Sequence, residues 1–129
     1  FKGQVPLWID EGIAQWEEPK KRAKARPIAF YLIQNQSVIP LADLTVMNDL
    51  SGKDENTVHV FYMQSVSLVD FMIKSYGAQS FTDFCRQLRD GKRLNEALRF
   101  TYSRSIKDID ELQTKWLKSI LDEYQPKEE

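Results

Sequence analysis

VPLWIDEGIAQW, residues 5–16, is the most informative segment of this 129-residue sequence. Its proline stands in the first turn, where a helix tolerates it, and the next proline is Pro19. A helix is therefore predicted over about residues 6–18. At helical spacing one face carries the large apolar residues and a glycine, namely Trp8, Ile9, Gly12, Ile13 and Trp16. Asp10 and Glu17 fall on the opposite side, so the helix is expected to pack one face on the protein and turn the other to water.

Glu11 lies at the border of this apolar face, with Leu7 and Ala14 on one side and Trp8 on the other. A carboxylate in such surroundings needs a partner, because an isolated buried charge is strongly unfavourable. A metal ion, a hydrogen-bond donor or an arginine would each serve. The plainer alternative is a carboxylate at the helix surface whose neighbours happen to be apolar. The residues alone leave these alternatives open.

Composition places the chain among globular proteins, with 42% hydrophobic and 29% charged residues. We expect a single domain over residues 1–129. The net charge of −1 gives no electrostatic argument for binding nucleic acid or an anionic membrane. Cys85 is the one cysteine, so the chain has no internal disulfide. No apolar run is long enough to span a bilayer.

The segment after Pro19 is strongly basic, with Lys20, Lys21, Arg22, Lys24 and Arg26. It is interpreted as a solvated loop or helix extension balanced by neighbouring glutamates, because no aromatic residues alternate with the charges as they do in nucleic-acid binders. Residues 28–33 and 38–41 are apolar and flank a polar turn, which is compatible with a small β-hairpin after the first helix. Residues 48–56 are polar and are predicted to form an exposed loop.

Helical periodicity dominates the rest of the chain. A long helix is predicted over about residues 57–76, where the apolar stripe is Tyr62, Val66, Val69, Ile73 and Tyr76, and Gly77 suits its C-cap. A third helix carries Phe81, Phe84, Cys85 and Leu88 and ends at Gly91, and a shorter fourth carries Leu94, Ala97 and Leu98. Ser105, with Asp108 three residues on, is expected to cap a last helix that carries Ile106, Ile109, Trp116, Leu117, Ile120 and Leu121. The fold class is therefore mainly α, and the polar tail from Pro126 is expected to fray.

The first helix resembles the W-x-x-E-G-x-A helix of the gluzincin zinc metallopeptidases, which include thermolysin-like enzymes and zinc aminopeptidases. It looks closest to the peptidase MA-like branch. The resemblance implies that Glu11 is the third zinc ligand. In the family the other two ligands are histidines of an upstream H-E-x-x-H helix whose glutamate is the general base. Gly12 and Ala14 would be the small residues that let the helix pack closely on its neighbours.

A second block, FYMQSVSLVDFMIKSYG (residues 61–77), is similar to the helix that follows the zinc helix in the same family. Zinc aminopeptidases carry a related Y-x-K-G-A helix there, and its tyrosine hydrogen-bonds the oxyanion of the tetrahedral intermediate. The resemblance thus implies that Tyr62 is a transition-state donor, a task that suits a neutral phenol. The alternative is a core aromatic residue with its hydroxyl at the rim. The resemblance continues to about Leu121, although Tyr102-Ser103 stands where the family pattern favours glycine after the threonine.

The sequence contains no H-E-x-x-H, and His59 is its one histidine. Residues 1–129 are therefore expected to be the C-terminal half of a peptidase MA-like catalytic domain, inactive alone and without zinc. The resemblance implies a peptide or protein substrate, the missing N-terminal half as a partner, and location in the bacterial cell envelope or outside the cell. A half-domain would also expose apolar faces, so some self-association is expected, whereas nucleic acid is not.

The alternative function is a non-catalytic helical interaction or scaffold domain, in which Glu11 pairs with an internal arginine or lysine. His59, three positions before Tyr62, is interpreted as a surface or hydrogen-bonded residue, with a role in substrate binding or proton transfer as the less favoured reading. Cys85 is interpreted as a buried and inert thiol.

Overall fold

The computed structural model describes residues 5–124, and these residues form seven helices and no strand. The helices are α1 (Leu7–Trp16), α2 (Pro19–Gln34), α3 (Leu41–Leu44), α4 (Glu55–Tyr76), α5 (Ala78–Arg89), α6 (Leu94–Tyr102) and α7 (Ile109–Tyr124). The predicted mainly α fold is thus confirmed. The predicted fraying of the tail from Pro126 concerns residues outside the described range. Within that range, no helix combines the length and hydrophobicity that crossing a membrane requires.

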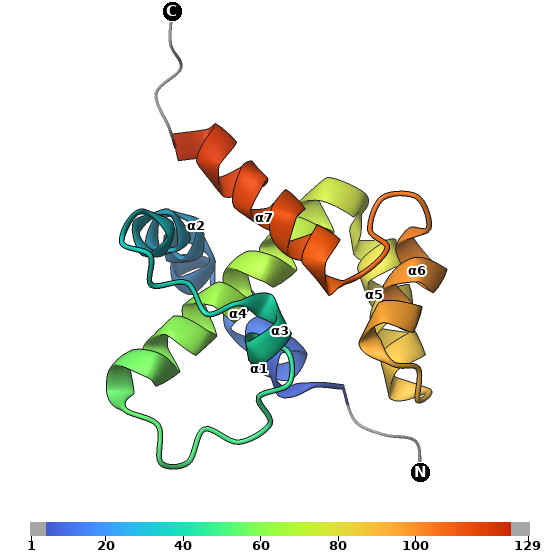
Figure 1. Cartoon of the computed structure of the whole chain (residues 1–129), viewed down its shortest axis with the longest axis horizontal. Helices are drawn as coiled ribbons and strands as arrows, with labels where there is room; N and C mark the ends of the chain where they lie inside the picture. Colours follow the sequence, from blue (N-terminus) through green and yellow to red (C-terminus); the bar gives the residue numbers. More distant parts are fainter. Residues whose placement is uncertain (1–4, 125–129) are drawn as a thin grey trace, which may run out of the picture.

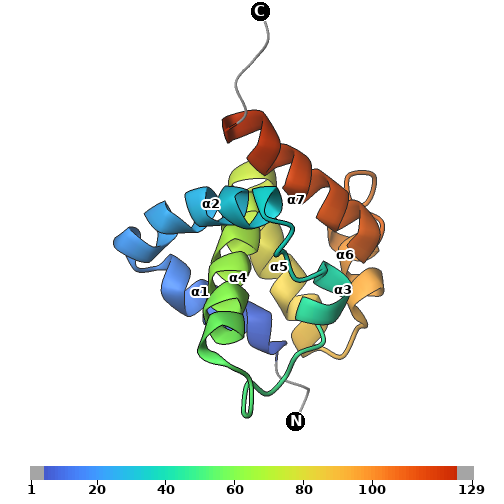
Figure 2. The same cartoon turned by 60° about the vertical axis from the view of Figure 1, so that its left-hand side comes forward.

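Helix α4 forms the centre of the molecule (Figures 1 and 2), with α1 and α2 on one side and α5 to α7 on the other. Every residue from Val60 to Met72 except Tyr62 is buried, including Gln64, Ser65, Ser67 and Asp70. A helix buried on all sides is a core helix. The predicted stripe therefore marks only one of the faces that α4 buries.

The ends of α4 follow from local signals. Asp54 caps the first turn, since its Oδ1 accepts a hydrogen bond from the backbone N–H of Thr57 at 2.7 Å. Gly77 ends the helix with a φ of +97°, a conformation that a side chain would strain, and it also precedes the first turn of α5. The predicted glycine cap is confirmed.

The β-hairpin suggested for residues 28–41 is wrong. Residues 28–33 continue α2 through Pro27, although a proline inside a helix is unfavourable. The reason is tertiary packing: Ala25, Ala29 and Leu32 form one buried helical face, and α2 packs on α4 and α7. Burial of this face outweighs the β-propensity of the apolar run.

The segment expected to be the second hairpin arm is held by a side chain instead of a strand. Gln64 of α4 is fully buried, its Oε1 accepts from the backbone N–H of Ile39 at 2.7 Å, and its Nε2 donates to the Ile39 carbonyl at 2.9 Å. The next free backbone N–H, that of Leu41, donates to Gln113 of α7 at 2.7 Å. Two glutamine side chains thus satisfy the backbone of this connection.

The last helix begins later than predicted. Ser105 does not cap it; Asp108 does, because its Oδ1 accepts from the backbone N–H of Glu111 at 2.9 Å. Ile106 lies in the connection before α7 and is nevertheless fully buried. Trp116 of α7 is also fully buried and donates its Nε1–H to Ser67 of α4 at 2.9 Å. This bond joins the last helix to the central one.

Candidate functional site

Glu11 stands on α1 at the edge of the surface that contacts α4. Trp8, Ile9 and Gly12 form the buried side of the helix, Asp10 is exposed, and Glu11 is half-buried between them. The ion pairs among residues 5–124 use other carboxylates and leave Glu11 without a basic partner. Nor does Glu11 accept any of the side-chain hydrogen bonds found in this part of the chain. Glu11 thus has neither an ion-pair partner nor a side-chain hydrogen bond within residues 5–124.

Gly12 fixes the approach of α1 to α4. A Cβ at this position would lie 2.8 Å from Cγ2 of Val69 and 2.9 Å from the carbonyl oxygen of Ser65. Both distances are shorter than real Cβ atoms show, so only glycine allows this spacing. The predicted close packing at Gly12 is confirmed. Ala14 is different, because it is exposed and takes no part in the contact between the two helices.

Tyr62 lies on the α4 surface that faces the end of α1. Its ring packs on buried residues of the core, which agrees with the core reading, and the residue stays half-buried because one side is open. That side lines a pocket of about 330 Å³. The pocket is formed by Gln15 of α1, by His59, Tyr62 and Met63 of α4, and by Lys21, Lys24 and Ile28 of α2.

Glu11 does not line this pocket, but its neighbour Gln15 does. Gln15 is one helical turn after Glu11, so the two side chains are neighbours on the same face of α1. His59 is in the same relation to Tyr62 on α4. Glu11 and Tyr62 thus belong to two helices that pack on each other, and Gln15, the neighbour of Glu11 on α1, lines the same pocket as Tyr62. His59, interpreted from the sequence as a surface residue, is exposed and lines the pocket as well.

Trp16 anchors the end of α1 beneath this surface. Its Nε1 donates to Oδ1 of the fully buried Asp70 at 2.9 Å, and the guanidinium of Arg22 lies 4.7 Å from the centre of its ring. Asp70 is also 3.4 Å from Lys74 and 4.0 Å from Arg26. Sequence reasoning missed this buried carboxylate, because Asp70 falls beside and not within the predicted stripe of α4.

No group of three or more His, Cys, Asp or Glu side chains that could hold a metal ion occurs among residues 5–124. Glu11 is thus a single potential ligand. Catalytic zinc sites use three protein ligands and keep a position open. A zinc site at Glu11 would need further ligands from outside the described residues.

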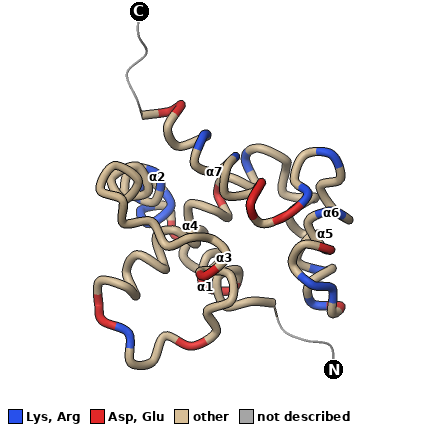
Figure 3. Tube along the Cα trace, in the orientation of Figure 1, with Lys and Arg blue, Asp and Glu red and all other residues tan. Residues whose placement is uncertain are grey.

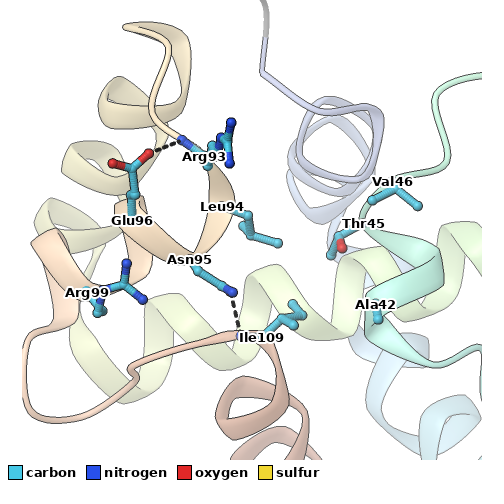
Figure 4. A pocket seen from close by; sticks show the side chains of 9 residues that line it. All are labelled: Ala42, Thr45, Val46, Arg93, Leu94, Asn95, Glu96, Arg99 and Ile109. Atoms are coloured by element: carbon cyan, nitrogen blue, oxygen red, sulfur yellow. Dashed lines mark hydrogen bonds between the residues drawn. The ribbon is translucent and has the colours of Figure 1, made fainter.

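A larger pocket of about 710 Å³ lies between α3 and α6 (Figure 4). Two of its polar side chains are bonded within the protein: Glu96 accepts from the backbone N–H of Arg93 at 3.1 Å, and Asn95 accepts from that of Ile109 at 3.0 Å. Neither Glu11 nor Tyr62 contributes to it. This pocket is therefore separate from the candidate site.

Cys85 is half-buried on α5, and burial raises the pKa of its thiol to about 11. Almost none of the thiol is then ionised at neutral pH, and the thiolate is the reactive form. The structure agrees with the interpretation of Cys85 as an inert thiol.

The domain is helical, and it carries Glu11, which forms no ion pair within residues 5–124, and Tyr62 on two adjoining helices. This arrangement is compatible with a peptidase-related protein. The sequence profile of the Peptidase MA superfamily matches residues 1–122. The chain belongs to this superfamily, whose members are generally zinc-dependent metallopeptidases. Searches of curated proteins and of solved structures gave no significant match.

Proposed function

We propose that this chain contributes one side of the catalytic centre of a zinc-dependent peptidase, with Glu11 as a zinc ligand and Tyr62 as the oxyanion donor. The observation that supports it most is Glu11 itself, a half-buried carboxylate with no basic partner among residues 5–124, held on a helix that Gly12 seats against α4. The remaining ligands and the general base would come from an H-E-x-x-H helix outside residues 1–129. By themselves these residues would be inactive.

The chemistry divides between the metal and the chain. Zinc, when bound, polarises the peptide carbonyl and makes water a better nucleophile. Glu11 would hold the ion through its carboxylate, and its freedom from internal partners suits that role. The Tyr62 hydroxyl would donate a hydrogen bond to the negative charge that develops on the carbonyl oxygen. The packing of the Tyr62 ring on the core fixes the donor in place before the substrate binds.

The substrate would be a peptide or protein, and the principal partner would be the N-terminal half of the catalytic domain. Exposed apolar residues such as Val46 and Phe100 would support self-association when that half is absent. Location in the bacterial cell envelope or outside the cell remains part of the same proposal.

The test is zinc content and peptide hydrolysis of the full-length protein, in which this chain would be extended upstream by at least about 60 residues that include the H-E-x-x-H helix. We expect one zinc per chain in the wild type. Glu11→Gln should weaken zinc binding at least about a hundredfold, because substitution of a residue that only orients a metal ligand already weakens metal binding by about 10- to 100-fold. Asp10→Asn is the matched control: it changes the exposed carboxylate next in sequence and should leave zinc content unaltered.

Tyr62→Phe should lower kcat about 100- to 1000-fold with zinc content unchanged, as expected for loss of one oxyanion donor. Tyr31→Phe, at an exposed position of α2, should have no effect. Full zinc occupancy in Glu11→Gln would contradict the assignment of Glu11. Folded full-length protein without zinc or activity would favour the alternative, a helical scaffold domain.

A further inference from the structure

The pocket beside Tyr62 has a distinct chemical character. Its bottom is apolar, from Ile28 and Met63, and its rim carries Gln15, Lys21, Lys24 and His59. Within residues 5–124, no carboxylate lines it. A volume of about 330 Å³ is ample for one extended side chain.

The two lysines come to the pocket because α2 is a helix. Lys21, Lys24 and Ile28 follow each other at spacings of three and four residues, which places them on one helical face. Figure 3 shows Lys and Arg along α2. The arginines of this basic segment are engaged elsewhere: Arg22 stacks on Trp16, and Arg26 bonds Glu123 of α7 at 2.6 Å. Lys21 and Lys24 are therefore the basic residues of α2 that face the pocket.

Neighbouring acids only partly neutralise this charge. Lys21 lies 3.3 Å from Glu18, but both side chains are about half exposed, and such surface pairs are weak. Lys24 forms no ion pair within residues 5–124. Glu55, one turn before His59 on α4, is exposed and does not line the pocket. The rim thus offers positive charge and N–H donors to an incoming group.

We propose that this pocket is a specificity site that binds a carboxylate of the peptide substrate. The inference rests on the proposed function for its position next to the reacting bond. Lys24 and Lys21 would supply charge, and the amide of Gln15 a directed hydrogen bond. Ile28 and Met63 would contact the methylene groups of a glutamate. A peptide offers such a carboxylate in an acidic side chain and at its C-terminus, and the test distinguishes these two sources.

The first measurement is binding and needs no catalysis. Fluorescent hexapeptides, in which a single glutamate is moved through an alanine–glycine sequence, are titrated into the full-length protein in the presence of a chelator. Each has a glutamine counterpart, and each is made with a free and an amidated C-terminus. We expect one glutamate position, or the free C-terminus, to tighten binding by about two- to fivefold, the upper part of the range for exposed charge pairs.

Lys21→Gln/Lys24→Gln should abolish this preference while leaving the binding of the uncharged peptides unchanged. The matched control is Lys20→Gln/Lys53→Gln, which removes the same charge at two exposed positions that do not line the pocket. It should keep the preference. Circular dichroism of both double variants verifies that they fold.

Equal binding of glutamate, glutamine and amidated peptides to the wild type would overturn the inference, as would an equal loss in both double variants. Failure of the proposed function gives a different result, since a protein without zinc or hydrolysis could still prefer acidic peptides. With active enzyme the same preference should appear in kcat/KM and be lost in Lys21→Gln/Lys24→Gln.

Discussion

At Tyr102, burial is favourable for the aromatic ring and unfavourable for the hydroxyl group. It is 5% exposed, its ring packs on Phe84 and Tyr76, and its hydroxyl has no hydrogen-bond partner within residues 5–124. Burial is the main cause that raises the pKa of this phenol above its ordinary value. The fold therefore favours the protonated form.

We expect Tyr102→Phe to keep or raise stability at pH 7, by up to about 1 kcal/mol, because it removes an unpaired buried hydroxyl. In the wild type the unfolded chain ionises Tyr102 near pH 10 while the folded chain keeps the proton. The contribution of the protonated Tyr102 to the free energy of unfolding is thus fully present below pH 10 and is lost as the pH rises above 10. The variant should lose less stability between pH 8 and 10.5, measured by urea unfolding.

Tyr31→Phe, at a position 63% exposed, is the control and should follow the wild type at both pH values. A loss of more than 1 kcal/mol in Tyr102→Phe at pH 7 would show that the hydroxyl does have a partner.

At the scale of elements, the contact between α1 and α4 sets the position of Glu11. Gly12→Ala would place its Cβ within 3 Å of Val69 and of the Ser65 backbone. The helices must then separate, and we expect a loss of about 1–3 kcal/mol in urea unfolding, as for other overpacked contacts. Under the proposed function, zinc affinity of the full-length protein should fall as well, since Glu11 moves with α1.

Val69→Ala combined with Gly12→Ala tests the cause. Val69→Ala removes the clash with the Val69 side chain but not the clash with the Ser65 carbonyl. The free energy of unfolding should therefore recover only in part. Gly12→Ala with unchanged stability would mean that α1 does not approach α4 so closely.

The elements also show what sequence reasoning can and cannot provide. The long helix and its end at Gly77 were predictable, because a sustained apolar period and a glycine with positive φ are local signals. Helix α2 was not, since its identity depends on the packing of Ala25, Ala29 and Leu32 against other helices. The start of α7 was misplaced because Ser105 and Asp108 are both good capping residues and only tertiary context selects Asp108.

For the candidate site the same division applies. Glu11 and Tyr62 could be singled out because each belongs to a helix that the sequence predicts and to a motif with a family resemblance. The pocket wall formed by Lys21, Lys24 and Ile28 could not, because the local sequence is compatible with a loop or a helix at residues 20–26 and favours a strand at residues 28–33. Once α2 is known to be helical, the spacing of these three residues is the signal.

For the whole molecule, Asp70 joins parts of the chain that are distant in sequence. It accepts from Trp16 of α1 and lies 4.0 Å from Arg26 of α2, which in turn donates to Ser119 and Glu123 of α7. Four helices therefore meet around one buried carboxylate. The terminal helices are tied to the central helix through this cluster.

Asp70→Ala should destabilise the protein by about 3 kcal/mol or more, because it removes the acceptor of Trp16 Nε1 and the buried negative charge that faces the largely buried Arg26. Asp70→Asn keeps an oxygen for Trp16 and should cost about 1 kcal/mol. Urea unfolding measures both, and hydrogen exchange should show faster opening of α2 and α7 in Asp70→Ala. Equal effects of the two substitutions would contradict this prediction, since they would show that the charge of Asp70 stabilises the fold and its hydrogen bond to Trp16 does not.

Between positions 62 and 70, helix α4 makes several contacts that depend on the spacing of its residues. Gly12 of α1 packs on Ser65 and Val69, and Gln64 binds the connection at residues 38–41. The same segment carries Tyr62 and Asp70, and Asp70 accepts from Trp16. Each residue of an α-helix turns the next by about 100°. One inserted or deleted residue between positions 62 and 70 would therefore swing Tyr62 away from α1 while the rest of the helix stayed in place. The number of residues between positions 62 and 70 is therefore fixed by these contacts. Insertions and deletions among relatives should occur in the loop at residues 45–54 and not in this segment of α4.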